Sequence, residues 1–271
     1  MNRDALALFP LRQTSTIPSV TADEMREVDR LATQDATLDL LQMMENAGRA
    51  LATIVRDYSP PDGEGDTGGG PTGGSAILIM AGKGNNGGGA LAAARHLRNW
   101  GYDPQVVLSA PPNSLGDAAA HQHHTLHKDG LRSLWAGSRE FDEQFPQLLH
   151  EAAIVIDGLI GYNLDAALRG DTAVMVEAIL DRAPPVVVSL DVPTGIDATS
   201  GEIRSAGVVA TSTLTLALPK TGLLQGDATA AVGDLLLADI GIPNYIFERI
   251  GRTPPADLFA ASSIVRLVGS G

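Results

Sequence analysis

Short apolar runs alternate along most of the chain with longer segments in which apolar residues recur at helical spacing. The runs are typical of strands buried on both faces of a sheet. They lie at residues 76–81, 104–109, 152–156, 186–190, 211–218 and 233–240. The periodic segments predict amphipathic helices. They lie at residues 21–32, 38–57, 90–100, 141–150 and 172–182, and a further helix starts at 111–114.

This alternation predicts an α/β fold with a mostly parallel central sheet that helices flank on both faces. A chain of 271 residues is within the range of one α/β domain, so we expect one core. We expect residues 1–18 to be a loose N-terminal segment, 19–250 to be the domain and 251–271 to be a C-terminal tail. Residues 59–75 are rich in Pro, Gly and Ser, which is typical of a flexible insert.

Two local patterns refine the first two helices. Thr21 followed by Glu24 predicts a capping box at the start of the first helix. In the second helix, polar Asn46 and small Gly48 stand beside an apolar stripe, which indicates close packing against another element. Glu45 either takes part in that contact or is an exposed helix acid.

Composition and charge narrow the class of protein. Hydrophobic residues make up 44% of the chain and aromatic residues 4%, so the core is built from Ala, Val, Leu and Ile. The formal net charge of −13 argues against nucleic acid or an anionic membrane as a general partner. No apolar run approaches the roughly 18 residues of a membrane span, and residues 1–15 have no signal-peptide pattern. The absence of cysteine excludes a thiolate nucleophile and is compatible with a reducing cytoplasm, where we expect the protein.

A glycine-rich segment at residues 82–89 follows the strand at 76–81. We expect a loop, which can take positive φ at several positions and bring bare backbone close to a ligand. The next helix would then offer its N-terminal N–H groups to a phosphate. The segment matches neither the dinucleotide fingerprint nor the P-loop, so a tight turn that needs glycine for packing is the alternative. The amides of Asn85 and Asn86 can donate, accept, or give an oxygen to a hard cation.

Charged residues stand at the carboxyl ends of three predicted strands. Asp157 and Asp191 each follow a buried strand, and Lys220 follows the strand at 211–218. Open α/β sheets bind ligands at this rim. We therefore expect Asp157 and Asp191 to reach the crevice beside the glycine loop, although Asp157 could instead cap the next turn. This convergence is the strongest physical indication of catalysis in the sequence.

A cluster of histidines marks the helix that starts at 111–114. It contains His121, His123, His124 and His127. His123 and His127 are four residues apart and could share a metal ion, but no third ligand is evident, so a solvated helix face is the alternative.

Several segments together resemble the YjeF N-terminal domain family, whose characterised members are NAD(P)H-hydrate epimerases. They stand in the family's order and cover about residues 19–243. The segments are Met25-Arg26-Glu27-Val28-Asp29, Met44-Glu45-Asn46-Ala47-Gly48-Arg49-Ala50, Gly84-Asn85-Asn86-Gly87-Gly88, Ile156-Asp157-Gly158-Leu159-Ile160-Gly161, Leu168-Arg169-Gly170, Asp191-Val192-Pro193-Thr194-Gly195-Ile196-Asp197, Pro219-Lys220-Thr221-Gly222 and Ala238-Asp239-Ile240-Gly241-Ile242-Pro243.

The resemblance implies a Rossmann-like three-layer fold and a homodimer. It also implies an activity: interconversion of the R and S forms of hydrated NADH or NADPH, in which water has added across the nicotinamide ring. A dehydratase then restores the cofactor from one epimer. This chain ends soon after the epimerase part, so we expect that dehydratase to be a separate chain.

The resemblance also implies site residues. The metabolite would be bound by Asn85, Asn86, Gly87, Gly88, Gly89, Gly161, Tyr162, Asn163, Leu164, Asp165, Ala166, Ala167, Asp191 and Lys220. A potassium ion would be held by oxygen atoms of Asn86, Asp157 and Thr194. Asp191 is the candidate catalytic residue, because inversion of the hydroxyl-bearing carbon needs a carboxylate to move a proton.

The chain departs from the family pattern at two places. The family motif has Asp where Gly89 stands, and Tyr162 and Asp165 lie in a turn where small residues are usual. If the missing Asp shapes the loop or binds ribose, activity survives with weaker binding. If it moves a proton, the alternative is a non-catalytic module that binds a nucleotide-type metabolite or a protein.

Overall fold

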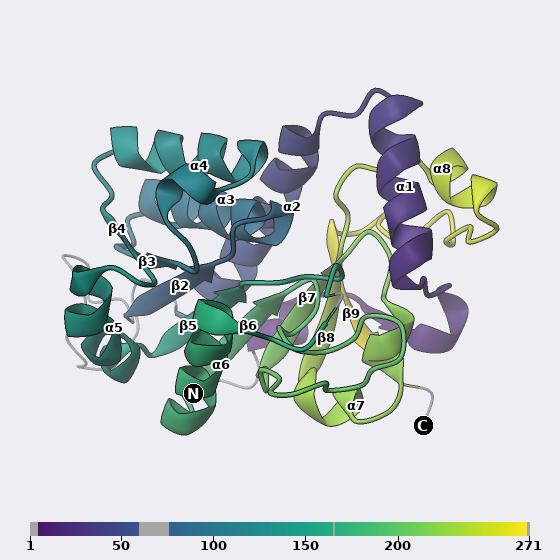
Figure 1. Ribbon diagram of the computed structural model, residues 1–271. Coiled ribbons are helices and arrows are strands. Elements are labelled where there is room, and N and C mark those ends of the chain that lie inside the picture. Colours follow the sequence, from purple (N-terminus) through teal and green to yellow (C-terminus); the bar gives the residue numbers. More distant parts are fainter. Residues whose placement is uncertain (1–4, 60–75, 165, 270–271) are drawn as a thin grey trace.

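The computed structural model describes residues 5–59, 76–164 and 166–269, which form three layers (Figure 1). Within these ranges the middle layer is a nine-stranded sheet. Its strands are β1 (Leu11–Gln13), β2 (Ile77–Ala81), β3 (Gln105–Leu108), β4 (Ser133–Trp135), β5 (Ile154–Gly158), β6 (Val186–Leu190), β7 (Ser212–Leu216), β8 (Asp234–Ala238) and β9 (Ile264–Val268). The strand order is β1-β9-β8-β7-β6-β5-β2-β3-β4, and only the β8–β9 pair is antiparallel among these strands. The predicted α/β fold with a mostly parallel sheet is confirmed.

Helices cover both faces of the sheet. They are α1 (Ala22–Gln34), α2 (Leu40–Tyr58), α3 (Asn85–Asn99), α4 (Asp117–Lys128), α5 (Arg139–Glu151), α6 (Gly170–Arg182), α7 (Ala228–Ala231) and α8 (Asn244–Arg249). Helices α2, α3 and α4 lie on one face, and α5 and α6 lie on the other (Figure 1). Leu91 of α3 is in the core cluster of Ile79 and Ile156, and Phe145 of α5 is in that of Val155. The alternating side chains of each strand thus fill both interfaces.

The order of the strands reverses between β2 and β5. The chain runs outward from β2 through β3 to β4, and from β5 it runs the other way through β6 and β7 to β8. The two central strands pair directly, with Ala81 opposite Gly158. Where the order reverses, the loops that leave neighbouring strands go to opposite faces and a crevice remains between them.

Two predicted local features of α1 and α2 are present. The hydroxyl of Thr21 accepts the N–H of Glu24, whose carboxylate accepts the N–H of Thr21. Gly48 packs closely on α3, since a Cβ there would lie 2.5 Å from that of Ala92. Glu45 takes part in this contact, because it forms an ion pair with Arg95 of α3.

The prediction of a loop over the whole of residues 82–89 is wrong. Helix α3 begins at Asn85, and none of the glycines in this segment has positive φ. Glycine is needed there for space, as the tight-turn alternative proposed. A Cβ on Gly82 would lie 1.8 Å from the carbonyl oxygen of Leu159, and one on Gly87 would lie 1.8 Å from the carbonyl oxygen of Gly82.

The edges of the sheet include strands that the sequence pattern did not predict. β1 lies in the segment 1–18 and β9 in the tail 251–271, both of which we expected outside the domain, and β4 lies in the connector before α5. β1 and β4 have three residues each, too few to show a period. β9 is positioned by β8 and β1, distant partners that its own sequence does not specify. Residues 60–75 of the predicted insert lie outside the described residues.

Candidate active site

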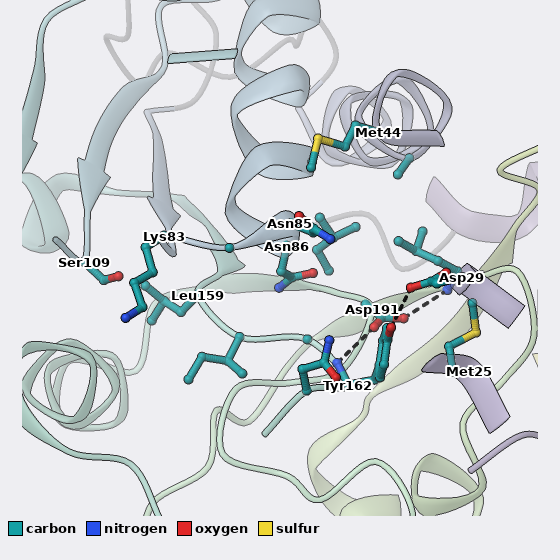
Figure 2. Close-up of a pocket in the computed structure, with 18 of the residues that line it drawn as sticks. Met25, Asp29, Met44, Lys83, Asn85, Asn86, Ser109, Leu159, Tyr162 and Asp191 are labelled. Atoms are coloured by element: carbon teal, nitrogen blue, oxygen red, sulfur yellow. Dashed lines mark hydrogen bonds between the residues drawn. The ribbon is translucent and has the colours of Figure 1, made fainter. Parts of the chain in front are cut away.

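A cavity of about 650 Å³ lies at the carboxyl ends of β2, β3, β5, β6 and β7. This is the point where the strand order reverses, and the volume suits a small-molecule ligand. Met25 and Asp29 of α1 and Met44 of α2 close the cavity from the side. Figure 2 shows Lys83 and Ser109 towards one end, Asp29, Tyr162 and Asp191 towards the other, and Asn85 and Asn86 between them.

The first end of the cavity is suited to an anion. Helix α3 begins there with Gly84 as N-cap, and helix α6 begins with Arg169 as N-cap; neither has a side-chain cap. The N–H groups of both first turns therefore face a site that Lys83 and Arg169 also line. A phosphate group is the ligand that such helix starts favour.

Asp191 is held at the tip of β6 in a strained turn. Its φ is 68°, and the N–H of Val192 donates to the carbonyl oxygen of Leu190 at 2.9 Å, which closes a three-residue turn. The carboxylate forms a buried ion pair with Lys220 and accepts the N–H of Tyr162 at 3.1 Å. Lys220 is 1% exposed and also donates to the carbonyl oxygen of Leu216 at 2.8 Å. The N–H of Leu216 also donates to the Asp191 carboxylate, at 3.4 Å, so three groups orient it.

Tyr162 and Asp29 form a second pair in the cavity. The hydroxyl of Tyr162 donates to Oδ2 of Asp29 at 2.5 Å, and Nζ of Lys220 lies 5.8 Å from the centre of the Tyr162 ring. Burial raises the pKa of Asp29, and the charge of nearby Asp191 raises it further. Burial and the Asp29 charge raise the pKa of the Tyr162 hydroxyl. Both groups therefore hold a proton more firmly than they would in water.

Asp157 lies behind the cavity and is fully buried. One carboxylate oxygen accepts hydrogen bonds from the hydroxyl of Ser189 at 2.8 Å and from the N–H of Thr194 at 2.9 Å. The other accepts a hydrogen bond from the hydroxyl of Thr194 at 2.7 Å. Burial raises the pKa of Asp157, although these hydrogen bonds oppose the shift. Asp157 is not among the residues that line the cavity, so the prediction that it reaches the crevice is wrong. Its carboxylate fixes the loop after β6 and accepts the N–H of Leu159 at 3.3 Å, as the capping alternative proposed.

The structure brings many of the predicted metabolite-binding residues to the cavity. Those that line it are Asn85, Asn86, Gly89, Gly161, Tyr162, Asn163, Asp191 and Lys220. Others do not line it: Gly87 and Gly88 face the loop at Gly82 and the side chain of Met44. Leu164, Ala166 and Ala167 are also not among the lining residues, and Asp165 lies outside the described residues. The helical start of α3 explains the first difference, because it turns successive residues away from the cavity.

The prediction for a metal among the histidines of α4 gains no support. Within the described residues, no group of three or more His, Cys, Asp or Glu side chains could hold a metal ion. Nε2 of His123 instead lies 2.8 Å from the hydroxyl of Ser133, and its ring stacks on that of His127.

Three cavity residues, Lys83, Ser109 and Asp29, are not predicted as site residues by the sequence. Lys83 was read only as part of the glycine segment, Ser109 as the end of a strand, and Asp29 as a motif residue without a role. The sequence contains a signal for Lys83 and Ser109, because each lies within two residues of the end of a buried parallel strand. Asp29 reaches the site only through the packing of α1, which no local pattern specifies.

The fold and cavity define an α/β protein with a cavity suited to a phosphate-bearing small molecule at the reversal point of a parallel sheet, beside a buried carboxylate–lysine pair. The chain belongs to the family described as YjeF-related protein N-terminus, whose family model matches residues 40–222. The resemblance that the sequence motifs suggested is therefore confirmed.

Relatives and solved structures agree with this membership. The chain is 40% identical to the NAD(P)H-hydrate epimerase of Dehalogenimonas lykanthroporepellens, over 97% of this chain and 98% of that protein. It is 33% identical to the bifunctional NAD(P)H-hydrate repair enzyme Nnr of Salinibacter ruber, over 93% of this chain but 44% of that protein. The crystal structure of yeast YNL200c matches 93% of this chain with a TM-score of 0.77 at 24% identity, which shows the same fold.

None of the helices in the described ranges is long and apolar enough to cross a membrane.

Proposed function

We propose that this protein is an NAD(P)H-hydrate epimerase, which interconverts the two epimers of hydrated NADH or NADPH. The observation that carries the proposal is the buried Asp191–Lys220 pair, which opens on a cavity whose other end is suited to phosphate. The name and full-length similarity of the Dehalogenimonas protein support the substrate.

The two ends of the cavity suggest how the substrate lies. Its diphosphate would meet Lys83 and the start of α3, and its hydrated ring would then reach Tyr162 and Asp191. Inversion requires the bond from carbon to the added hydroxyl to break and to form again on the other face. The carboxylate of Asp191 would take a proton from the water that adds. Lys220 and the N–H of Tyr162 keep this carboxylate in place.

The experiment that tests the proposal starts from one resolved epimer of each hydrate. Chromatography should show the other epimer forming until both are present. Asp191→Asn should slow this by roughly 100-fold or more, because it removes the proton acceptor. Asp181→Asn on the exposed part of α6 is the matched control and should match the parent.

Asp191→Asn leaves Lys220 buried without its anion, which costs roughly 3–5 kcal/mol in comparable cases. The double variant Asp191→Asn/Lys220→Met removes both charges and keeps the test valid if the single variant fails to fold. A folded variant that epimerises at the parent rate contradicts the role of Asp191. A parent protein that leaves both epimers unchanged contradicts the proposed function.

A potassium ion held by Asn86, Asp157 and Thr194 is part of this proposal. The donor set fits: carboxylate, hydroxyl and carbonyl oxygens gather there, since Oγ1 of Thr194 lies 2.7 Å from Asp157 and 3.2 Å from the carbonyl oxygen of Ile160. Nδ2 of Asn86 is buried without a partner among the described residues, so its amide is free to turn its oxygen inward. The ion would supply positive charge beside the fully buried Asp157.

Thermal unfolding tests the ion directly, without the substrate. A ligand of the folded state raises the Tm in proportion to the logarithm of its concentration above Kd. KCl should therefore raise the Tm more than choline chloride at equal ionic strength, and Asp157→Asn should abolish the difference. Equal Tm values in the two salts would refute the site.

We also propose that a separate dehydratase consumes one epimer. The segments that match this chain make up 44% and 41% of two bifunctional relatives, so more than half of each relative lies outside the match. Their length and their names support a second activity linked to the first. The homodimer and the cytoplasmic location stay predictions.

A further inference from the structure

Three elements bring polar atoms to one bare glycine in the cavity. Gly161 lies in the loop after β5, Asn86 is the second residue of α3, and Asp191 follows β6. A Cβ on Gly161 would lie 2.9 Å from Oδ2 of Asp191 and 3.1 Å from Oδ1 of Asn86. All three residues line the cavity, and Figure 2 shows the amide of Asn86 pointing into it beside Asp191. The carboxylate and the amide therefore face the same side of Gly161.

The backbone on either side of Gly161 is fixed. The N–H of Ile160 donates to the hydroxyl of Thr194 at 3.0 Å, and the N–H of Tyr162 donates to Oδ2 of Asp191 at 3.1 Å. Gly161 does not have a positive φ, so its backbone conformation does not require glycine. Glycine is needed here for space, because a side chain would fill the gap between the carboxylate and the amide.

The two carboxylate oxygens of Asp191 have different surroundings. Oδ1 is ion-paired with Lys220 and accepts the N–H of Leu216 at 3.4 Å. Oδ2, which faces Gly161, accepts the N–H of Tyr162 at 3.1 Å. Since a carboxylate oxygen can accept two hydrogen bonds, Oδ2 has capacity for a further donor from the cavity.

The amide of Asn86 has a donor to offer. Nδ2 is buried without a hydrogen-bond partner among the described residues, while Oδ1 faces the carboxylate of Asp191. A buried N–H without an acceptor costs free energy, and two facing oxygen atoms share no proton. Exchange of the two amide ends removes both costs. The NH₂ group then faces Asp191, and the oxygen turns inward, as the proposed potassium ion also requires.

A donor and an acceptor on the same side of Gly161 are suited to one protonated oxygen atom. Such an oxygen can give its proton to Oδ2 of Asp191 and accept the N–H of Asn86. We propose that the gap over Gly161 is the subsite for the reacting oxygen, which is the water that adds to the ring or the hydroxyl that this addition forms. The inference rests on the proposed epimerase function, and it makes Asn86 a catalytic residue that orients this oxygen.

The step at this subsite needs no further reactant. The water oxygen gives an electron pair to the cationic ring carbon that remains when the hydroxyl has left. The C–O bond forms, and one proton of the water passes to Oδ2 of Asp191. In the opposite direction Oδ2 returns the proton, the C–O bond breaks and its electron pair leaves with water. The N–H of Asn86 aligns the oxygen in both directions, on the face of the ring beside Asp191.

Gly161→Ala is the decisive variant, because its methyl group fills the gap and keeps both Asn86 and Asp191 in the chain. It should lower kcat roughly 100-fold or more, since a displaced oxygen loses its alignment, with KM little changed. Gly269→Ala is the matched control, because no atom lies within 4 Å of its Cβ. Parent kcat in Gly161→Ala overturns the inference.

Asn86→Asp separates the donor from the ion. This variant keeps an oxygen for potassium but replaces the NH₂ group with a second oxygen. We expect kcat to fall by a factor similar to that of Gly161→Ala, while KCl still raises the Tm more than choline chloride does. Parent kcat in Asn86→Asp contradicts the role of its N–H.

A readout independent of turnover completes the test. A crystal structure of the parent protein without substrate should show a water over Gly161 within about 3.2 Å of both Oδ2 of Asp191 and the amide of Asn86. Gly161→Ala should lack this water. If the parent protein does not interconvert epimers, the proposed function fails, and the water still decides whether the subsite exists. A parent structure without a water at this position overturns the inference.

Discussion

Glycines of the segment 82–89 illustrate how a single hydrogen atom in place of a side chain positions a site. Gly82 and Gly87 contact each other's backbone and the carbonyl of Leu159, so β2, α3 and the loop after β5 meet with no room for a Cβ. Gly84 stands beside them with open space around it. The tight contact draws the start of α3 to the cavity, where its N–H groups can serve a ligand.

Two glycine variants test whether these positions need glycine for space. Gly87→Ala would put a Cβ 1.8 Å from the carbonyl oxygen of Gly82, a backbone atom that has no room to move. We expect a loss of roughly 3 kcal/mol or more in the free energy of unfolding, measured by urea denaturation. Gly84→Ala is the matched control and should cost about 1 kcal/mol or less, as expected for an N-cap position. Similar losses in both variants would show that backbone freedom, not space, is the reason for glycine.

Asp191 shows what the sequence leaves open at this scale. Its place after a buried strand was predictable from the apolar run at 186–190, as was the nearby Lys220. Its positive φ and the ion pair with Lys220 were not, because both depend on the turn at the tip of β6 and on the neighbouring strand β7. Strain of this kind is maintained by surrounding contacts and leaves no local pattern.

His123, which contacts Ser133 of β4 from α4, makes the stability of the protein depend on pH. Burial, followed by repulsion from His127 and His124, lowers its pKa below 6.5. The unfolded chain therefore takes up a proton at higher pH than the folded protein does. Stability is fully present above pH 6.5 and is lost as the pH falls from there through the folded pKa. His96 of α3, whose pKa burial also lowers, acts in the same direction.

Urea unfolding between neutral pH and pH 5 measures this effect. The free energy of unfolding should fall with acidity less steeply in His123→Gln than in the parent, and His96 should account for part of the remaining slope. His121→Gln, exposed on the same helix, should leave the slope unchanged. An unchanged slope in His123→Gln would contradict the argument.

At the scale of the elements, the starts of α3 and α6 lie at the same end of the cavity. Neither helix start has a side-chain cap, and each stands beside one cation, Lys83 at α3 and Arg169 at α6. Removing one cation should weaken binding without altering the reaction centre. We expect Lys83→Gln and Arg169→Gln each to raise KM by roughly 5- to 30-fold at low salt with kcat little changed, as for charge-assisted contacts to phosphate. Lys128→Gln at the exposed end of α4 is the control. A fall in kcat alone would place these cations at the reacting ring.

Most of the helices and inner strands could be predicted, and the edges could not. The buried runs at β2, β5 and β6 are continuous and apolar, and the capping box of α1 marks its start within a few residues. β4 and β1 are short, and the first turn of α3 is made of Asn and Gly, which are poor helix formers. Tertiary contacts through Gly82 and Gly87 override that propensity.

At the scale of the whole molecule, a net charge of −13 would repel the anionic substrate that we propose. The fold reduces this conflict by placing the cations Lys83, Arg169 and Lys220 at the cavity, where they balance the acids Asp29, Asp171 and Asp191 that also line it. The arrangement depends on the sheet as a unit, since the three cations follow or flank β2, α6 and β7, elements that lie on both sides of the reversal point.

The antiparallel strand β9 closes that unit, and its removal should disrupt the site. Val265 and Leu267 are buried against Leu235 and Leu237 of β8 in one core cluster. A chain that ends at Pro254 loses these side chains, each of which contributes roughly 1.5–3 kcal/mol on burial, and exposes the edge of β8 to other molecules. We expect this truncated protein to aggregate, or to unfold at much lower urea concentration, when sedimentation and denaturation are measured. Leu11→Ser on β1, where the side chain is 58% exposed, is the matched control and should stay soluble and stable. A soluble truncated chain with the parent unfolding midpoint would place the tail outside the domain, as the sequence pattern first indicated.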